Sequence, residues 1–317
     1  MISIQVPCST ANLGPGFDVL GLALSLYLEL QVSVISSSSR AHLNCEITCA
    51  GLGAENLRTD PEQNLITQVA LYVLRCHSQH EFPHLTKVHI INGIPLSRGL
   101  GSSAAAVVAG ALLANEVGRL QLTKDRILDF CLMVERHPDN ITAALYGGFV
   151  GACLSELDPE DAARVEVPLA EVLPEPAGGV DTGKQPPVPP LGIGHFERFR
   201  LSPDIKAVVV IPNFKVDTAK AREVLPNQYS RQDLVYTSQR IAILTQILGQ
   251  PPTDPKKVHL AMQDRMHQPY RANLVPGLSK AIETLTPSSY PGLLGVCLSG
   301  RIHFQDSMNE SKRILIQ

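Results

Sequence analysis

Hydrophobic and polar positions alternate strictly along the segment that begins at Leu22. Leucines and valines occupy every second position as far as Val34, and mostly polar residues lie between them. This period of two predicts a half-buried β-strand over residues 22–34. Four consecutive serines follow the alternation and predict a turn or loop.

A longer period predicts helices in the next part of the chain. Apolar residues between Gln63 and Ser78 fall on one stripe, which indicates a helix. We expect a short strand at Lys87–Ile91, then a glycine-rich turn, then a helix of small residues at about Ser102–Val117. Thr123 is expected to cap a helix that reaches Val134, and Pro138 is expected to interrupt the chain after it.

A change in composition divides the chain. Residues 174–194 contain six prolines and five glycines, which favours a loop or insert between two domains, 1–173 and 195–317. The second domain is expected to hold a buried strand and several helices. The predicted segments are the strand Ile205–Ile211, helices near Asp217–Val224, Asp233–Leu248 and Val258–Met266, and a strand-like run at Gly295–Leu298.

The composition excludes several classes of protein. The chain has 317 residues, a formal charge of −3, 44% apolar residues and 18% charged residues. These values are typical of a globular chain and argue against disorder, and the length suggests about two domains. The near-neutral charge gives no basic surface for nucleic acid. The best apolar run, Ala104–Ala114, is shorter than the roughly 18 residues that a membrane-spanning helix needs.

The N-terminus and the cysteines indicate a cytoplasmic protein. No basic segment followed by an apolar one is present at the start, so no secretory signal is expected. The seven cysteines are odd in number, scattered, and include no CxxC pair. We therefore expect buried, reduced thiols.

The strongest candidate site is the glycine-rich segment Pro95–Ala105. Gly99 and Gly101 allow a backbone to approach a ligand closely, and Ser102 opens a helix whose first N–H groups suit a phosphate. No Gly-Lys-Ser/Thr follows, so this is not a Walker A loop. An ordinary turn with a serine cap explains the glycine spacing equally well.

Two further polar segments offer candidate ligands. In Pro7–Gly21, Asn12 and Asp18 offer an acceptor and an anion to a substrate ammonium or hydroxyl; the alternative is an Asx turn and a loop carboxylate. In Glu135–Ile141, a carboxylate has the chemistry to hold Mg²⁺ and Asn140 to orient a hydroxyl. A turn with a glutamate at a helix end is the alternative there.

Two segments in the second half carry arginines. Thr218 and Arg222 are four residues apart and share a helix face, where Arg222 has the geometry to bind a carboxylate with two bonds. On spacing alone, a solvated helix face is the preferred interpretation. Gln263–Arg271 contains two arginines and a histidine near a proline.

Taken in order, these segments resemble the homoserine kinases of the GHMP small-molecule kinase superfamily, over about Pro7–Gly300 and most closely the fungal ones. The resemblance implies an α+β, two-lobed GHMP kinase fold, with an N-terminal ribosomal-protein-like βαβ domain and a C-terminal ferredoxin-like sandwich. It also implies the reaction ATP + L-homoserine → ADP + O-phospho-L-homoserine, on the way to threonine. The implied partner is therefore a small molecule, with neither nucleic acid nor membrane, and a homodimer is left open.

The resemblance implies a role for each candidate that binds homoserine. Asn12 and Asp18 would contact the amino acid, while Arg222 and Arg271 would hold its carboxylate with Thr218 nearby. On this basis we predict that Arg271→Ala mainly weakens homoserine binding, because a planar guanidinium takes a carboxylate in two bonds.

The remaining roles concern ATP, Mg²⁺ and the reacting hydroxyl. Ser103 or Glu135 would touch Mg²⁺, and Asn140 would orient the hydroxyl. Related mevalonate kinases place an aspartate base in this region, which makes Asp139 a second candidate. The residues that would wrap the ATP phosphates are Pro95, Leu96, Ser97, Arg98, Gly99, Leu100, Gly101, Ser102 and Ser103.

The resemblance stops near the C-terminus. The family's third motif begins well at Gly295–Gly300, but the Ala-Gly-Pro-Thr part is replaced by a different sequence from Arg301. We therefore expect a C-terminal domain that is truncated and atypical from residue 301, and an impaired or unstable kinase. Two alternatives stay open: a kinase for another small alcohol such as mevalonate, and a relative that binds ATP without turnover.

Overall fold

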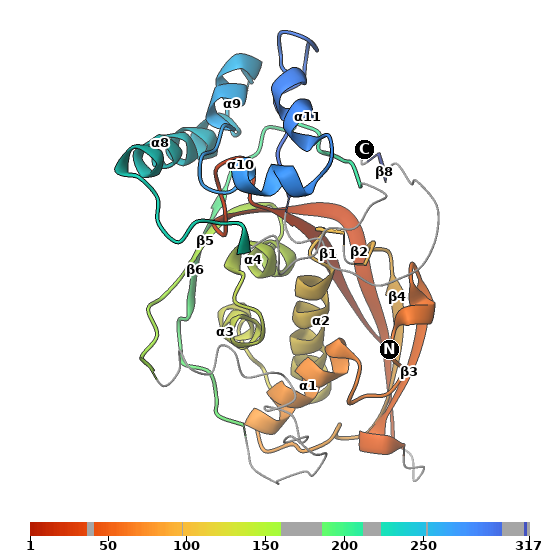
Figure 1. The fold of residues 1–317 in the computed structure, drawn as a ribbon. Coiled ribbons are helices and arrows are strands. Elements are labelled where there is room, and N and C mark those ends of the chain that lie inside the picture. The colour runs from red at the N-terminus through yellow and green to blue at the C-terminus, as the bar shows by residue number, and fades with distance from the viewer. Residues whose placement is uncertain are drawn as a thin grey trace.

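A six-stranded sheet forms the centre of the molecule (Figure 1). The computed structural model describes residues 1–36, 41–96, 98–159, 186–211, 223–251, 253–299 and 314–315. Strands run in the order β3-β4-β2-β5-β6, and β1 pairs with β2 beside this path. Their bounds are β1 Ile2–Ala11, β2 Leu20–Ile35, β3 Cys45–Gly51, β4 Leu85–Asn92, β5 Phe149–Leu154 and β6 Gly194–Phe199.

The long alternating segment is the central strand, β2. It pairs antiparallel with β1, β4 and β5, and its side chains alternate between buried and more exposed over much of its length. The predicted strand at 22–34 is thereby confirmed, as is the strand at Lys87–Ile91, which lies within β4. β3 pairs parallel with β4, and the α-helix Leu65–Cys76 (α1) connects them.

Four helices cover one face of the sheet (Figure 1). α1, α2 (Ser102–Val117) and α3 (Lys124–Val134) confirm the helices expected from the apolar stripes, and Thr123 caps α3 as predicted. The small residues of α2 let it approach α1 closely, because a Cβ at Gly110 would overlap the Ile66 carbonyl. The fourth helix, α4 (Pro138–Tyr146), was not predicted.

The sheet continues past the proline-rich segment. β6 pairs antiparallel with β5, so the first residues of the predicted second domain complete the N-terminal sheet. Residues 160–185 lie outside the described part of the chain. Residues 186–193 of this segment form a loop. The Arg126 guanidinium holds it by donating to the carbonyls of Pro189 (2.6 Å) and Pro190 (2.8 Å). The domain division itself stays a prediction.

The C-terminal part contributes helices at the end of the sheet where β1 is connected to β2 (Figure 1). They are α8 Arg231–Ile247, α9 Pro255–Ala261, α10 Gln268–Arg271 and α11 Leu278–Thr284. The helix predicted at Asp233–Leu248 corresponds to α8. A two-residue ladder joins β7 (Val208–Val209) to β8 (Ile314–Leu315). The described residues of the expected ferredoxin-like sandwich contain these elements.

Three predictions in this part are wrong in detail. The strand predicted as buried at Ile205–Ile211 reduces to β7, and Val210 is 83% exposed, because only alternate residues pack toward the core. The helix predicted to reach Met266 ends at Ala261. The backbone N–H groups of Met266 and His267 donate to the Asp264 carboxylate and not to helix carbonyls. Gly295–Leu298 forms no strand. Most of the helix predicted near Asp217–Val224 lies outside the described residues.

The cysteines follow the expectation only in part. All seven are free thiols, and Cys8, Cys45, Cys76 and Cys131 are buried, whereas Cys153 is exposed on β5. Burial raises the pKa of the Cys8 thiol to about 11. Among the described residues, no helix is long and apolar enough to cross a membrane.

Candidate active site

The glycine-rich segment forms the turn between β4 and α2. Gly99 and Gly101 have φ values of +73° and +60°, a region that glycine adopts without strain. Leu100 is buried between them and fixes the turn to the core. Gly101 caps α2, a helix of 16 residues, so the first N–H groups and the positive end of the helix dipole face the turn. This geometry suits a phosphate.

The flanking residues of this turn are placed less uniformly. Pro95 and Leu96 are half-buried after the end of β4, and Arg98 is exposed. Ser102 and Ser103 begin α2, with Ser103 exposed. Ser97 lies outside the described residues.

The loop between β1 and β2 carries Asn12 and Asp18. Both adopt left-handed backbone conformations, with φ of +61° and +54°. The Asn12 side chain is buried, and its Oδ1 accepts a hydrogen bond from the Asp18 backbone N–H at 2.9 Å. The Asx-type alternative therefore describes Asn12, which shapes the loop that presents Asp18. A contact of either residue with substrate stays a prediction.

The turn between α3 and α4 brings the predicted metal ligands together. Ser103 Oγ, in the first turn of α2, donates to Glu135 Oε2 at 2.7 Å. His137 Nδ1 lies 3.5 Å from the other oxygen of Glu135. Pro138 occupies the first turn of α4, where its missing N–H costs nothing, so a proline expected to interrupt the chain instead begins a helix.

Asp139 is a buried acid at the start of α4. Asp139 is only 1% exposed. The pKa of its carboxyl is raised to about 7, mainly by desolvation and then by the negative charge of Asp18. Its Oδ1 accepts from the backbone N–H of Asn140 at 2.8 Å and from Asn140 Nδ2 at 3.2 Å. Within the described residues, Oδ2 has no hydrogen-bond partner.

The C-terminal helices bring Arg271 to the loop between β1 and β2. Arg271 is buried at the end of α10, with its guanidinium carbon 5.6 Å from the ring centroid of Phe17. The Phe17 ring stacks on His267 at 5.2 Å, and His267 Nε2 lies 2.8 Å from the Gly14 carbonyl oxygen. Burial lowers the pKa of His267, so a neutral imidazole donates to that carbonyl. Arg271 and Asp18 both lie near His267 and Phe17, since both charges act on the His267 imidazole.

Two serines that the sequence reasoning missed connect these segments. Ser299 Oγ donates to the Gly99 carbonyl at 3.1 Å and contacts the Thr10 hydroxyl, so the start of the third motif lies against the glycine-rich turn. Ser9 Oγ donates to Asn140 Oδ1 at 3.0 Å. The alternation of Ile2, Ile4 and Val6 indicates a strand here but places residue 9 on the opposite, more exposed face. The register shift between Pro7 and Cys8 breaks this alternation, so residues 8–11 are all buried and the burial of Ser9 could not be read from the pattern.

The described candidates therefore meet at one end of the sheet, where the β1–β2 loop, the start of α2, the start of α4 and α10 converge (Figure 1). Thr218 and Arg222, the other two predicted substrate residues, lie outside the described residues. Their roles stay predictions.

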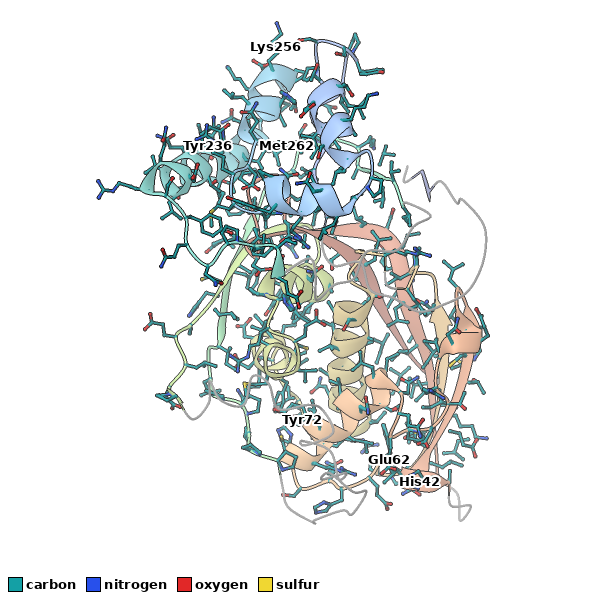
Figure 2. All side chains as sticks on the ribbon, in the orientation of Figure 1. His42, Glu62, Tyr72, Tyr236, Lys256 and Met262 are labelled. Atoms are coloured by element: carbon teal, nitrogen blue, oxygen red, sulfur yellow. The ribbon has the colours of Figure 1, made fainter. Side chains whose placement is uncertain are left out.

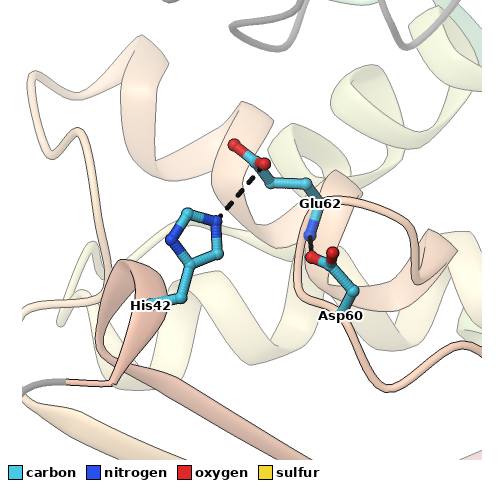
Figure 3. Close-up of side chains that lie close together, drawn as sticks. All are labelled: His42, Asp60 and Glu62. Atoms are coloured by element: carbon cyan, nitrogen blue, oxygen red, sulfur yellow. Dashed lines mark hydrogen bonds and ion pairs between the residues drawn. The ribbon is translucent and has the colours of Figure 1, made fainter. Parts of the chain in front are cut away.

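A second cluster of potential metal ligands lies at the far end of the molecule. His42, Asp60 and Glu62 offer ligand atoms within 4.8 Å of one another (Figure 3). Figure 2 shows His42 and Glu62 well away from Met262, whose backbone lies against Gly14 of the β1–β2 loop. The Asp60 oxygens already accept from the Glu62 N–H (2.9 Å) and the Gln63 side chain (3.3 Å), and His42 pairs with Glu62 at 3.3 Å. These contacts already give the three side chains partners within the protein.

Comparisons with known proteins agree with this geometry. The family described as "GHMP kinases N terminal domain" matches residues 64–148. A homoserine kinase of Saccharomyces cerevisiae is 53% identical over 305 residues, which cover 94% of this chain and 85% of that protein. A homoserine kinase of Candida albicans is 48% identical over 94% of this chain and 84% of its own length.

Solved structures show the same architecture. The crystal structure of homoserine kinase from Cytophaga hutchinsonii superposes with a TM-score of 0.68 at 25% identity, covering 94% of this chain and 82% of that one. The Methanococcus jannaschii mevalonate kinase superposes with a TM-score of 0.58 over 95% of this chain and 87% of its own, but at 13% identity it shows the fold alone. The two-lobed GHMP kinase fold is confirmed, and the chain belongs to the homoserine kinase family.

Proposed function

We propose that the chain transfers the terminal phosphoryl group of ATP to the hydroxyl of L-homoserine, forming ADP and O-phospho-L-homoserine. The observation that carries this proposal is the 2.7 Å hydrogen bond between Ser103 and Glu135. It joins the start of α2, at the phosphate-binding turn, to the segment that leads into α4 and Asn140. Family membership at 53% identity supports the same reaction.

The charges around the β1–β2 loop fit an amino-acid substrate. The planar Arg271 guanidinium suits a carboxylate, and the Asp18 carboxylate suits an ammonium group. Both lie near Phe17, since Arg271 packs over its ring and Asp18 follows it in the chain. Mevalonate has a carboxylate but no ammonium, so this pair of charges favours homoserine over it.

The donor set between α2 and α4 fits Mg²⁺. Mg²⁺ prefers oxygen ligands and usually takes one or two carboxylates together with substrate phosphates. The Ser103 hydroxyl and the Glu135 carboxylate offer such oxygens next to the phosphate-binding turn. When bound there with ATP, Mg²⁺ would neutralise charge on the phosphates. The backbone N–H groups at the start of α2 hold the phosphates in position.

Asn140 is the better placed of the two candidates for the substrate hydroxyl. Asn140 is half-buried, whereas Asp139 is almost completely shielded and turns one oxygen toward the Asn140 amide. A loose phosphoryl-transfer transition state depends on positioning and charge neutralisation more than on a strong base. We therefore assign Asn140 to orient the hydroxyl, and Asp139 to hold the Asn140 amide by accepting a hydrogen bond from it.

Three finer statements complete the proposal. The product would serve threonine formation, and the chain would act in the cytoplasm, as the sequence predicts. The homodimer stays a prediction as well. None of these affects the chemistry of the site.

A coupled ADP-release assay on the 317-residue chain tests the proposed function. The assay uses Mg-ATP with either L-homoserine or mevalonate, and ³¹P NMR identifies the phosphorylated product. ADP that depends on homoserine supports the proposal, whereas ADP that depends only on mevalonate overturns it. A folded chain that binds ATP without producing ADP would instead favour a binding protein and connect the loss to the sequence after Gly300.

A further inference from the structure

Ser9 is a fully buried polar residue near the end of β1. It is 0% exposed, and its hydroxyl donates a 3.0 Å hydrogen bond to Oδ1 of Asn140, 131 residues away in the chain. Buried hydroxyls require a partner, because an unsatisfied one carries the whole cost of its desolvation. In this structure the partner is the side chain that the proposed function assigns to the substrate hydroxyl.

The Asn140 carboxamide is held at both of its ends. Its oxygen accepts from Ser9, and its nitrogen donates to Asp139 Oδ1 at 3.2 Å. A half-turn of the amide would place its oxygen against the Asp139 carboxyl and lose the donation. Asp139 Oδ1 also accepts from the Asn140 backbone N–H, so it selects the orientation with the amide nitrogen toward it, and Ser9 holds that orientation by donating to the amide oxygen. The second N–H and the second lone pair of the amide are left for a ligand.

The Ser9–Asn140 pair lies directly against the phosphate-binding turn. A Cβ at Gly101 would overlap Ser9 Oγ and lie 3.1 Å from Asn140 Oδ1. The Ser9 backbone N–H also donates to the Leu100 carbonyl at 3.2 Å. The pair thus occupies the border between the bound phosphates and the acceptor hydroxyl, where small errors in orientation affect the reaction most.

We propose that Ser9 is a positioning residue for phosphoryl transfer, which fixes the orientation of the Asn140 amide toward the acceptor hydroxyl. The inference rests on the proposed function of this site. Ser9 itself does not touch the substrate and acts through Asn140. It should therefore influence kcat rather than the Michaelis constants, because binding of ATP and of the homoserine charges uses other residues.

Removal of the hydroxyl gives the direct test. Ser9→Ala keeps the backbone bond to Leu100 and removes only the side-chain donor. We expect kcat to fall about tenfold, the size of one well-placed hydrogen bond, with both Michaelis constants changed less than about twofold. A rise in the Michaelis constant for ATP with kcat retained would overturn the proposal, since it would mean that Ser9 only shapes the phosphate-binding turn.

A double-mutant cycle with Asn140→Ala separates positioning from a general structural effect. If Ser9 acts through Asn140, Ser9→Ala costs nothing further once Asn140 is alanine. Losses that multiply in the double variant would contradict the proposal. Thr86→Val is the matched control, because Thr86 is also a fully buried strand hydroxyl, bonded to the His84 carbonyl at 3.0 Å in β4. Its kcat should equal that of the unmodified chain, even if the melting temperature falls as far as in Ser9→Ala.

A spectroscopic measurement distinguishes this inference from the proposed function. The side-chain N–H₂ signals of Asn140, assigned by their loss in Asn140→Ala, should shift in Ser9→Ala and stay in place in Thr86→Val. Unmoved signals in Ser9→Ala would overturn the positioning role whatever the activity. An unmodified chain without homoserine turnover overturns the proposed function, whereas an active Ser9→Ala variant with unchanged kcat overturns only the role of Ser9.

Discussion

Replacing Asp139 with asparagine should change how the stability of the fold depends on pH. Asp139 has a folded-state pKa of about 7 against an ordinary value of 3.8, raised first by desolvation and then by Asp18. Between these values the folded chain binds a proton that the unfolded chain does not. The stabilisation from this proton is complete below about pH 4 and is lost as the pH rises through about 7.

The magnitude follows from the part of that interval that an experiment covers. Between pH 5 and the folded-state pKa of about 7 lie about two units, and each unit corresponds to about 1.4 kcal/mol. The unmodified chain should therefore lose about 3 kcal/mol of unfolding free energy from this group between pH 5 and pH 8. Asp139→Asn removes the titration and keeps an oxygen that accepts from Asn140, so the variant should lack this loss.

Urea unfolding of both chains at several pH values gives the measurement. The difference in unfolding free energy between the unmodified chain and Asp139→Asn should move by about 3 kcal/mol in favour of the variant from pH 5 to pH 8. Glu283→Gln makes the same carboxyl-to-amide change at an exposed position of α11 and serves as the control. Two parallel curves for the unmodified chain and Asp139→Asn would refute the reasoning about a buried, proton-binding carboxyl.

Three further predictions concern the other segments of the site. Arg271→Ala should raise the Michaelis constant for homoserine about 10- to 100-fold by loss of a charge-assisted bond, with that for ATP unchanged; an unchanged constant for homoserine in steady-state kinetics would exclude the assignment. Glu135→Gln should raise the Mg²⁺ concentration that gives half-maximal activity at least about tenfold, because a ligand is lost; an identical midpoint in the Mg²⁺ titration would exclude Glu135 from the metal site. Gly101→Ala should lower the melting temperature and abolish thermal protection by ATP, because its φ of +60° disfavours alanine and a Cβ would overlap Ser9; retained protection would show that the turn tolerates a side chain.

The parts of the fold that follow a simple period could be predicted from the sequence. β2 alternates because one of its faces lies against helices, and α1 carries a stripe for the same reason. The strand predicted at Ile205–Ile211 failed because the apolar run over residues 207–211 indicates burial on both faces, whereas Val208 and Val210 are exposed. Such a run reports the capacity of a segment to be buried and says nothing of which partners cover it.

The helix α4 shows a different limit of sequence reasoning. Proline ends a helix in most positions, so the sequence predicts an interruption at Pro138, although the first turn of a helix accepts proline. This error hid the fact that Asp139 and Asn140 share the first turn of a helix packed against β1 and β2. The chemical assignment of these residues came from the motif, but their burial and mutual hydrogen bonds could be seen only in the folded chain.

The glycines of the site explain why widely separated segments meet so closely. A Cβ at Gly21 of β2 would overlap the Asp139 carbonyl, and one at Gly101 would overlap Ser9. At both positions the missing side chain lets a core strand or turn touch the segment that carries a reacting group. The start of α4 therefore lies against β2 at the Asp139 carbonyl and is joined to β1 by the side-chain hydrogen bond between Ser9 and Asn140. Under the proposed function, contacts of this kind hold Asn140 in position before a ligand binds, as catalysis by orientation requires.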